Sequence, residues 1–258
     1  DYMDTRAFDA GVVLSALPQL LEFLDITLLV GISSIVLGSL LGGALAWAKL
    51  SQHKILNYLA QLYIYIMRCT PSIVMLFIVF YGLPALVEAV FEENIHDMDR
   101  AVFAIIAFTL LFSAYVSEIF RAAYKAVPQG QYEAAISIGI SPWGAFWHIM
   151  LPQTAVLALP NFGNSVINLL KEGALAYTIG LIDMIGKGNL IIAQNFGAYG
   201  IEIYLACMII YWLMSIGIEK AFGLLEQRLD KGQLFSSKAG KKQAVFILKE
   251  GEASGAGL

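Results

Sequence analysis

The sequence predicts an all-α integral membrane protein with five membrane-spanning helices. Of its 258 residues, 59% are hydrophobic and only 14% are charged, whereas soluble domains average about 45–50% apolar and about 25% charged residues. The chain also holds five runs without a charged residue, each close to the roughly 17–25 residues that a helix needs to cross about 30 Å of hydrocarbon. These runs lack the alternating pattern of a membrane β-barrel strand.

The predicted spans follow one another from residue 26 to residue 218. The first contains Gly38 and Gly42, a G-x-x-x-G pattern that permits close packing against another helix. After the fourth comes an uncharged piece, residues 173–182, which we expect to extend that span or to re-enter the membrane beside it. In order, the spans are 26–48, 69–87, 101–117, 154–170 and 203–218.

The placement of Lys and Arg predicts the side of the membrane on which each linker lies, because cytoplasmic loops carry an excess of these residues. Basic residues follow spans one, three and five, whereas the linker after span two is acidic. This alternation predicts an outside N-terminus, a cytoplasmic loop at about 128–152 and a cytoplasmic C-terminus. The basic residues are Lys49, Lys54 and Arg68, then Arg121 and Lys125, then Lys220, Arg228 and Lys231; the acidic linker holds Glu88, Glu92, Glu93, Asp97 and Asp99, with Arg100 as its one base.

We expect residues 1–230 to form one transmembrane domain and residues 231–258 to form a cytoplasmic tail. The tail is rich in Gly, Ser and Lys apart from a short "AVFIL" run, a composition that favours disorder. Cys69 and Cys207 both lie in apolar runs, which favours buried packing over a disulfide. The three histidines have no metal-ligand spacing, so we expect no metal site.

In the cytoplasmic loop "QYEAAISIGISPWGAFWHIMLP", residues 131–152, the helix-breaking and helix-capping residues predict two short helices joined by a turn. Gly139 suits a left-handed stop after the first helix. Ser141 followed by Pro142 is an N-cap followed by Pro at the first helical position. We expect Leu151-Pro152 to break the second helix before span four.

The composition of this loop suits contact with another protein. Ala134, Ala135 and Gly139 leave one side that a second backbone can approach closely, and Phe146 and Trp147 are rigid anchors of the kind that fill pockets on a partner. The alternative is an interfacial linker that packs only under the helices of its own chain.

The loop also resembles a family signature. Glu133-Ala134-Ala135, Gly139, Phe146, Ile149 and Leu151-Pro152 match E-A-A-x3-G-x6-F-x2-I-x-L-P, the coupling-loop pattern of ABC-importer permeases, at every fixed position. Residues 66–84, 118–131, 159–183 and 225–229 are similar to the polar amino-acid branch of that family, which imports histidine, glutamine, glutamate, arginine and cystine. The resemblance covers roughly residues 20–230.

The resemblance implies the fold of a type I ABC-importer permease in the bacterial plasma membrane. Such a subunit pairs with itself or with a homologue and sits on a dimer of ATPase subunits that use ATP and Mg²⁺. An extracytoplasmic binding protein delivers the amino acid, and no nucleic acid is involved. The residues implied in coupling to the ATPase are Glu133, Ala134, Ala135, Gly139 and Phe146.

We do not expect this chain to hydrolyse ATP itself or to bind a cofactor. Its nearest approach to a phosphate-binding loop runs from Gly180 to Gly188. It has five residues between the glycines where the motif has four, and no Ser or Thr follows Lys187. We interpret this segment as a polar turn outside span four.

Polar residues inside the spans are the candidates for a substrate path, because such residues are costly in a bilayer. Asn161, Asn164, Asn168 and Lys171 are spaced 3, 4 and 3 residues apart and share one helix face. Hydrogen bonding between helices is the alternative role. The path candidates are Arg68, Asn164, Ser165, Asn168, Ser113 and Ser117.

Two of these candidates bear on the substrate. The Arg68 guanidinium suits a bidentate contact with an α-carboxylate, although an Arg at a membrane boundary is also an ordinary anchor. In the resembling family, importers of cationic amino acids often carry an acid after the Asn equivalent to Asn164. The neutral Ser165 therefore favours a neutral or dipolar substrate such as glutamine or cystine.

Two other classes of protein compete with this interpretation. A secondary transporter or channel without an ATPase predicts acids for ion coupling within the spans or an inverted repeat. The spans hold almost no acids beyond Glu118, which can pair with Arg121. An intramembrane enzyme needs an arranged nucleophile and base or a metal set, and the sequence has no motif for either.

Overall fold

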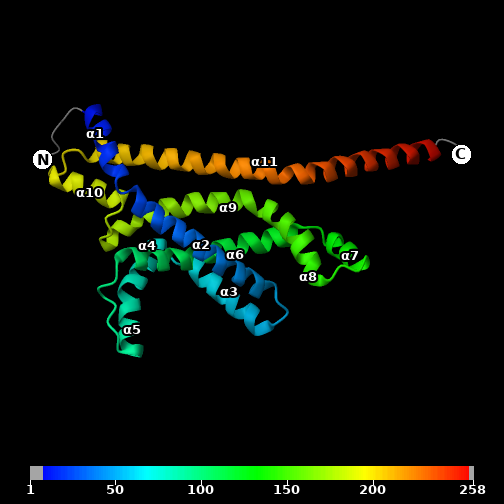
Figure 1. The fold of residues 1–258 in the computed structure, drawn as a ribbon, viewed down its shortest axis with the longest axis horizontal. Helices are drawn as coiled ribbons and strands as arrows, with labels where there is room; N and C mark the ends of the chain where they lie inside the picture. Colours follow the sequence, from blue (N-terminus) through cyan, green and yellow to red (C-terminus); the bar gives the residue numbers. More distant parts are fainter. Residues whose placement is uncertain (1–7, 256–258) are drawn as a thin grey trace.

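The computed structural model describes residues 8–255, with side chains described for residues 8–229. Within this range every regular element is helical, as the sequence predicts. The four longest helices are α2 (Leu24–Leu50), α6 (Arg100–Ala126), α9 (Leu151–Gly173) and α11 (Gly200–Gly255); α6, α9 and α11 run along the molecule, and α2 runs obliquely to them (Figure 1). Helices α1 (Ala10–Leu21) and α10 (Met184–Gln194) lie at one end of the molecule, and α7 (Gln129–Ser137) and α8 (Pro142–Ala145) lie at the other (Figure 1).

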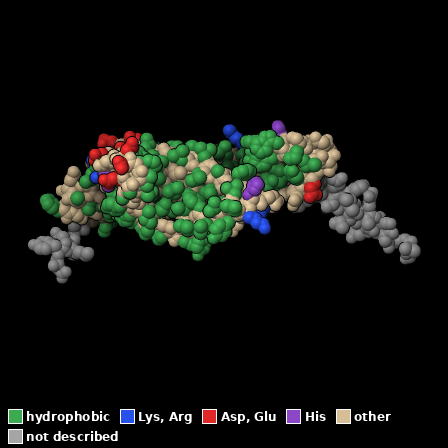
Figure 2. All heavy atoms as spheres, turned by 90° about the horizontal axis from the view of Figure 1, so that it is seen from below, with side chains coloured by type: hydrophobic (Ala, Val, Ile, Leu, Met, Phe, Trp, Pro, Cys, Tyr) green, Lys and Arg blue, Asp and Glu red, His purple; other side chains and the backbone are tan. Residues whose placement is uncertain are grey.

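The number of spans agrees with the prediction of five. Four helical stretches are long and apolar enough to cross a membrane, and a bent pair supplies a fifth when it is counted as one span. One face of the molecule is covered by hydrophobic side chains along its middle, with acidic side chains gathered towards one end (Figure 2). The stretches are Leu24–Leu50, Ser72–Phe91, Arg100–Ala126 and Gly200–Leu229, and the bent pair is Pro142–Ile179 with Met184–Gln194.

Helices α2 and α6 pack closely because α2 presents glycine to α6. A Cβ atom added to Gly42 would lie 2.9 Å from the Ser113 carbonyl oxygen, and one added to Gly38 would lie 2.9 Å from Cδ1 of Phe112. Both distances are too short for a real side chain. The G-x-x-x-G pattern therefore sets the spacing of this helix pair, as the sequence predicts.

The linker before the second span differs from the prediction, whereas the span itself, predicted at 69–87, corresponds to Ser72–Phe91. Residues that the sequence assigns to a linker form the helix α3 (Lys54–Cys69), which is interrupted at Thr70-Pro71 and followed by α4 (Ser72–Phe77). A π-helical turn, η1 (Ile78–Gly82), and α5 (Leu83–Phe91) continue it, and α5 runs crosswise to α6 and α9 (Figure 1). The break arises because Pro71 cannot donate a backbone hydrogen bond.

This correction changes the place of Arg68. It lies in the last turn of α3, 14 residues or about 21 Å of helix from Lys54. Its guanidinium lies 5.8 Å from the ring centroid of Tyr115, in the middle of α6. Arg68 is therefore not part of a basic rim around Lys49 and Lys54, and it carries no weight in the orientation argument.

The expected break at Leu151-Pro152 is also absent. Helix α8 continues through a π-helical turn, η2 (Phe146–Met150), into α9, and the Leu151 N–H bonds the Phe146 carbonyl five residues earlier. Pro152 stands in the first turn of α9. The wider π turn lets the helix pass the missing N–H of this proline without stopping.

The end of the molecule near α1 holds helices that the sequence does not predict. After α9 come the 3₁₀-helix η3 (Ala174–Ile179) and a left-handed Gly180, and α10 then turns back to pack with α1 and α11. Asp183 caps α10 by accepting a 2.8 Å hydrogen bond from the Gly186 N–H, and its side chain is buried. The segment interpreted as a polar turn outside span four therefore contains the start of a helix, with Asp183, Met184 and Gly186 buried.

Two smaller predictions have different outcomes. Cys207 is buried as expected, whereas Cys69, predicted to be buried, is exposed at the end of α3; both thiols are free. The backbone of α11 continues to Gly255. The side chains beyond Leu229 lie outside the described residues, so the disordered tail at 231–258 stays a prediction.

Candidate coupling loop and translocation site

The loop between α6 and α9 folds into the two short helices that its punctuation predicts. Gly139 adopts a φ of 88°, and the Ser141 hydroxyl accepts a 3.1 Å hydrogen bond from the Gly144 N–H at the start of α8. These two local features place α7 and α8 on either side of a tight turn.

The residues predicted to couple to a partner do not all point outwards. Glu133, Ala134 and Gly139 are exposed, whereas Ala135 is only 2% exposed and packs inside the chain. Of the E-A-A triplet, Glu133 and Ala134 therefore lie on the free surface of α7, and Ala135 does not.

Phe146 also has a different surrounding from the one predicted. It is half-buried, and its ring centroid lies 6.3 Å from that of Tyr124 on α6 and 5.8 Å from that of Trp143. These contacts make Phe146 a tie between the loop and α6. The large apolar side chains that the loop leaves most exposed are those of Ile138, which is 78% exposed, Trp143, which is 69% exposed, and Trp147.

A cavity of about 250 Å³ lies between α6 and α9. It brings together two of the predicted path residues, Ser165 and Asn168. Asn164 is exposed on the same helix, and Arg68 reaches this region through its contact with the Tyr115 ring. The lining consists of Leu111, Phe112, Tyr115, Ser165, Asn168, Leu169 and Glu172.

Two polar residues of this cavity, Tyr115 and Glu172, were missing from the predicted set. Tyr115 stands on the cavity face of α6, and Glu172 accepts a 2.7 Å hydrogen bond from the Ser72 hydroxyl at the start of α4. The sequence gives one weak indication of Glu172, because it is an acidic residue at the end of an apolar run. Tyr115 gives no such signal, because a tyrosine in a span is also an ordinary packing residue.

Ser113 and Ser117 lie away from the cavity. Both are fully buried, and the Ser113 hydroxyl lies 3.0 Å from the Tyr63 hydroxyl of α3. The Ser117 hydroxyl donates to the Ala114 carbonyl at 2.7 Å. These two serines hold helices together in this chain and do not face an open path.

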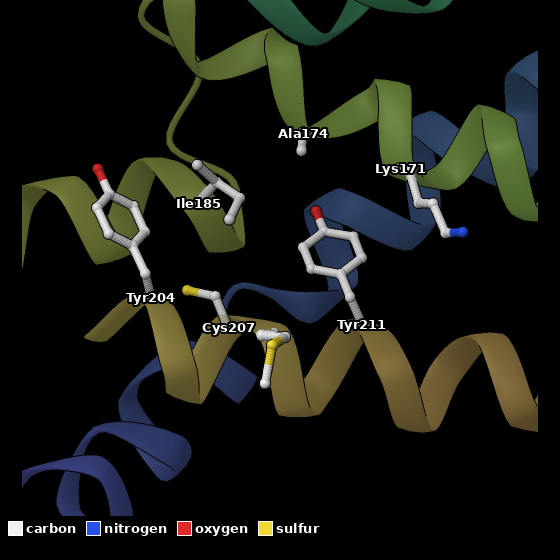
Figure 3. A pocket seen from close by; sticks show the side chains of 7 residues that line it. Lys171, Ala174, Ile185, Tyr204, Cys207 and Tyr211 are labelled. Carbon is white, nitrogen blue, oxygen red and sulfur yellow. The ribbon is translucent and has the colours of Figure 1, made fainter. Parts of the chain in front are cut away.

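The polar stripe of α9 is exposed along its whole length. Asn161, Asn164, Asn168 and Lys171 all lie on the open surface of the single chain. A second cavity, of about 280 Å³, borders the Lys171 end of the stripe between η3, α10 and α11 (Figure 3). There the Tyr211 side chain points towards α9, and its buried hydroxyl has no hydrogen-bond partner among the described residues.

The family is decided by a match that covers most of the chain. Residues 34–231 match the family model of the binding-protein-dependent transport system inner membrane component. The chain belongs to this family. It is therefore a membrane-spanning permease component of a transport system, and the alternatives of a secondary transporter and an intramembrane enzyme are set aside.

Individual relatives agree with the family. The L-cystine transport system permease protein TcyL of Bacillus subtilis is 39% identical over 228 residues, which cover 88% of this chain and 94% of that protein. The histidine/lysine/arginine/ornithine transport system permease protein HisQ of Salmonella typhimurium is 32% identical over 210 residues, which cover 80% of this chain and 91% of that one.

Solved structures agree in fold. A chain from the crystal structure of an amino acid ABC transporter with histidines is 30% identical, with a TM-score of 0.74 over 86% of this chain and all of that chain. A chain of the inward-facing MetNI methionine ABC transporter has a TM-score of 0.61 over 81% of this chain and 94% of that chain. At 16% identity, it supports the fold alone.

Proposed function

We propose that this chain is the permease subunit of an ATP-driven importer of polar amino acids. One observation carries the proposal: a chain of this family has both a cavity between α6 and α9 with polar residues in its lining and an exposed two-helix loop at one end. The relatives named above are permease proteins for cystine and for histidine and the basic amino acids. The chain supplies the path, and a separate ATPase subunit supplies the energy.

The loop of α7 and α8 is the proposed contact with the ATPase dimer, which binds ATP and Mg²⁺. Glu133, Ala134 and Gly139 present an open, small-residue face, and Trp143 and Trp147 stand exposed beside it. Aromatic side chains of this kind anchor protein interfaces when they enter pockets on the partner. Phe146 fixes the loop to α6, so that a push on the loop reaches the spans.

The proposed orientation places this loop in the cytoplasm of a bacterial cell and the N-terminus outside. Lys49, Lys54, Arg121 and Lys125 support it without Arg68, because excess Lys and Arg favours the cytoplasmic side. An amino-acid-binding protein then delivers substrate at the opposite, outer end.

A second permease subunit, a further copy or a homologue, is proposed to cover the exposed stripe of α9. Three asparagines and a lysine on one face of a membrane-spanning helix are costly against lipid. A facing subunit would replace lipid by polar groups and would enclose the path between the two chains.

The cavity between α6 and α9 is the proposed substrate site. Ser165 and Asn168 offer neutral hydrogen-bonding groups, and Glu172 offers a carboxylate to an ammonium group. Arg68, stacked near Tyr115, is suited to the α-carboxylate. This set favours a neutral or dipolar amino acid over a cationic one.

The test uses the complete transporter in lipid, with each candidate amino acid loaded on the binding protein. We expect one or a few polar amino acids to stimulate ATP hydrolysis and uptake. Glu133→Arg reverses a charge on the proposed interface, where a like-charge contact costs several kcal/mol. Stimulation by the loaded binding protein should therefore fall at least tenfold while the amount of folded permease stays unchanged.

Gln131→Arg is the matched control, because Gln131 is exposed on the same short helix and lies outside the E-A-A triplet. It should retain most of the stimulation. Normal transport by Glu133→Arg would show that α7 does not dock on the ATPase.

A further inference from the structure

An ion cluster lies between the cavity and the coupling loop. Glu118 of α6 contacts the Lys49 ammonium at the end of α2, and it accepts two hydrogen bonds from Arg121, at 2.8 Å from Nη2 and 3.1 Å from Nε. The side chains of Lys49, Glu118 and Arg121 are 22%, 18% and 24% exposed. The cluster is therefore largely shielded from solvent, where breaking an ion pair is costly.

Charge neutralisation does not explain the presence of Lys49. Arg121 stands one turn from Glu118 on the same helix and already offers a two-pronged contact to its carboxylate. Adding Lys49 gives the cluster two cations for one anion. What Lys49 adds is a link to another helix.

The cluster joins three helices at one point. Lys49 is the penultimate residue of α2, and the Asn57 side chain of α3 donates a 2.7 Å hydrogen bond to the Lys49 carbonyl. Helix α3 in turn carries Arg68, at its far end, to the Tyr115 ring. The end of α2 is thereby fastened to α6 through Glu118, and the start of α3 is fastened to the end of α2 through Asn57.

The position of Glu118 along α6 places it between the two candidate sites. Tyr115, which lines the cavity, precedes it by one turn. Gln129, where α7 begins, follows it by 11 residues, about 16 Å if the path were helical throughout. The glycine contact between α2 and α6 ends at Gly42, about 10 Å of helix before Lys49.

We propose that Lys49, Glu118 and Arg121 form a positioning cluster that makes α2 and α3 follow α6 when the coupling loop moves. The proposal rests on the proposed function, because it assumes that an ATPase displaces α7 and α8. In this arrangement, motion of α6 moves the Tyr115 wall of the cavity and, through α2 and α3, also moves Arg68, which lies beside Tyr115. Without Lys49, α6 moves and the end of α2 does not follow it fully.

The experiment compares Lys49→Gln, Glu118→Gln and Lys125→Gln in the assembled transporter in lipid. Lys49→Gln leaves the Glu118–Arg121 pair intact, so it removes the link between helices without stranding a buried charge. Lys125→Gln is the control, because Lys125 is exposed on the same helix and forms no ion pair among the described side chains. The readouts are the yield of assembled complex, basal ATP hydrolysis, stimulation by the loaded binding protein, and substrate imported per ATP.

Lys49→Gln and Glu118→Gln should assemble and keep basal hydrolysis, and both should lose at least fivefold in stimulation and in substrate imported per ATP. Lys125→Gln should stay within twofold of the wild type, and so should Lys49→Arg, which keeps the charge. Unchanged stimulation in Lys49→Gln would overturn the proposal. A loss matched by an equal loss of assembled complex would also overturn it, because the cluster would then serve folding alone.

The same assay separates this proposal from the proposed function. If no amino acid stimulates ATP hydrolysis by the wild-type complex, the proposed function is overturned, and the proposed role of the cluster is overturned with it. If the loaded binding protein stimulates ATP hydrolysis equally in the wild type and in Lys49→Gln, the proposed role of the cluster is overturned and the proposed function stands.

Discussion

Replacing Gly139 by alanine tests whether the turn between α7 and α8 presents the loop to its partner. Gly139 has a φ of 88°, and a Cβ atom added there would meet no other atom within 4 Å. The substitution therefore changes backbone energy without adding a clash. A left-handed conformation costs an L-residue about 1–2 kcal/mol, which lowers the population of the native turn by roughly 5- to 30-fold relative to an alternative turn.

Gly130 provides the matched comparison within the same loop. An alanine at Gly130 also meets nothing within 4 Å, but Gly130 lies in the first turn of α7 with an ordinary φ. Gly130→Ala should therefore stabilise α7 by about 0.5–1 kcal/mol. Asparagine tolerates left-handed backbone better than alanine, so Gly139→Asn should lie between Gly139→Ala and the wild type.

The assay is stimulated ATP hydrolysis at limiting ATPase subunit, with thermal unfolding of the purified permease measured in parallel. Gly139→Ala should lower stimulation under these conditions, by up to about 5- to 30-fold, which is the change in the ratio of the native to the alternative turn. Its unfolding temperature should change little, because the turn is exposed and outside the packed spans. Equal effects of Gly130→Ala and Gly139→Ala, or full stimulation in Gly139→Ala, would refute the argument.

Two further substitutions address the substrate site and the packing of the spans. Ser165→Glu adds a carboxylate to the cavity that already holds Glu172, so uptake should shift towards cationic amino acids; an unchanged profile in competition assays would remove Ser165 from the site. Gly42→Val forces a side chain against the Ser113 carbonyl, and overpacking of this kind costs about 1–3 kcal/mol, so the unfolding temperature should fall. Gly43→Val, whose Cβ meets nothing within 4 Å, should leave that temperature unchanged.

The sequence predicts features that depend on local chemistry. The spans follow from the length and composition of apolar runs. The turn at Gly139 and the cap at Ser141 follow from residues whose backbone preferences are strong. Both appear in the structure, with a left-handed glycine and a capping hydroxyl. The G-x-x-x-G of α2 belongs to the same class, because the size of glycine alone permits the close approach.

Features that depend on which residues pack around a side chain in the folded protein cannot be predicted from the sequence. Arg68 looks like a boundary anchor until α3 is known to be a helix that carries it to Tyr115. Ser113 and Asn168 are equally polar in the sequence, yet packing buries the first and leaves the second at a cavity. Helices α1 and α10 are short, so neither reaches the length by which a span is recognised.

Proline gives a misleading signal at residue 152. A proline normally ends a helix because it lacks a donor and crowds the preceding turn. The π turn before it supplies the extra room, and nothing in the local sequence distinguishes this outcome from a break. Pro71 does end a helix, whereas Pro18 and Pro160 stand inside α1 and α9, so the residue type alone does not decide the outcome.

The π turn has a mechanical consequence. Because the backbone from Pro142 to Ile179 is helical without a break, Trp143 on the exposed loop and Ser165 at the cavity belong to one continuous helix, which bends between α8 and α9 (Figure 1). They are 22 residues apart, which is at most about 33 Å of helix, so a tilt of about 5° at one end displaces the other end by up to about 3 Å. A small rotation of the short helix α8 against its partner is thus multiplied into a shift as large as an atomic contact at the site where an amino acid would sit.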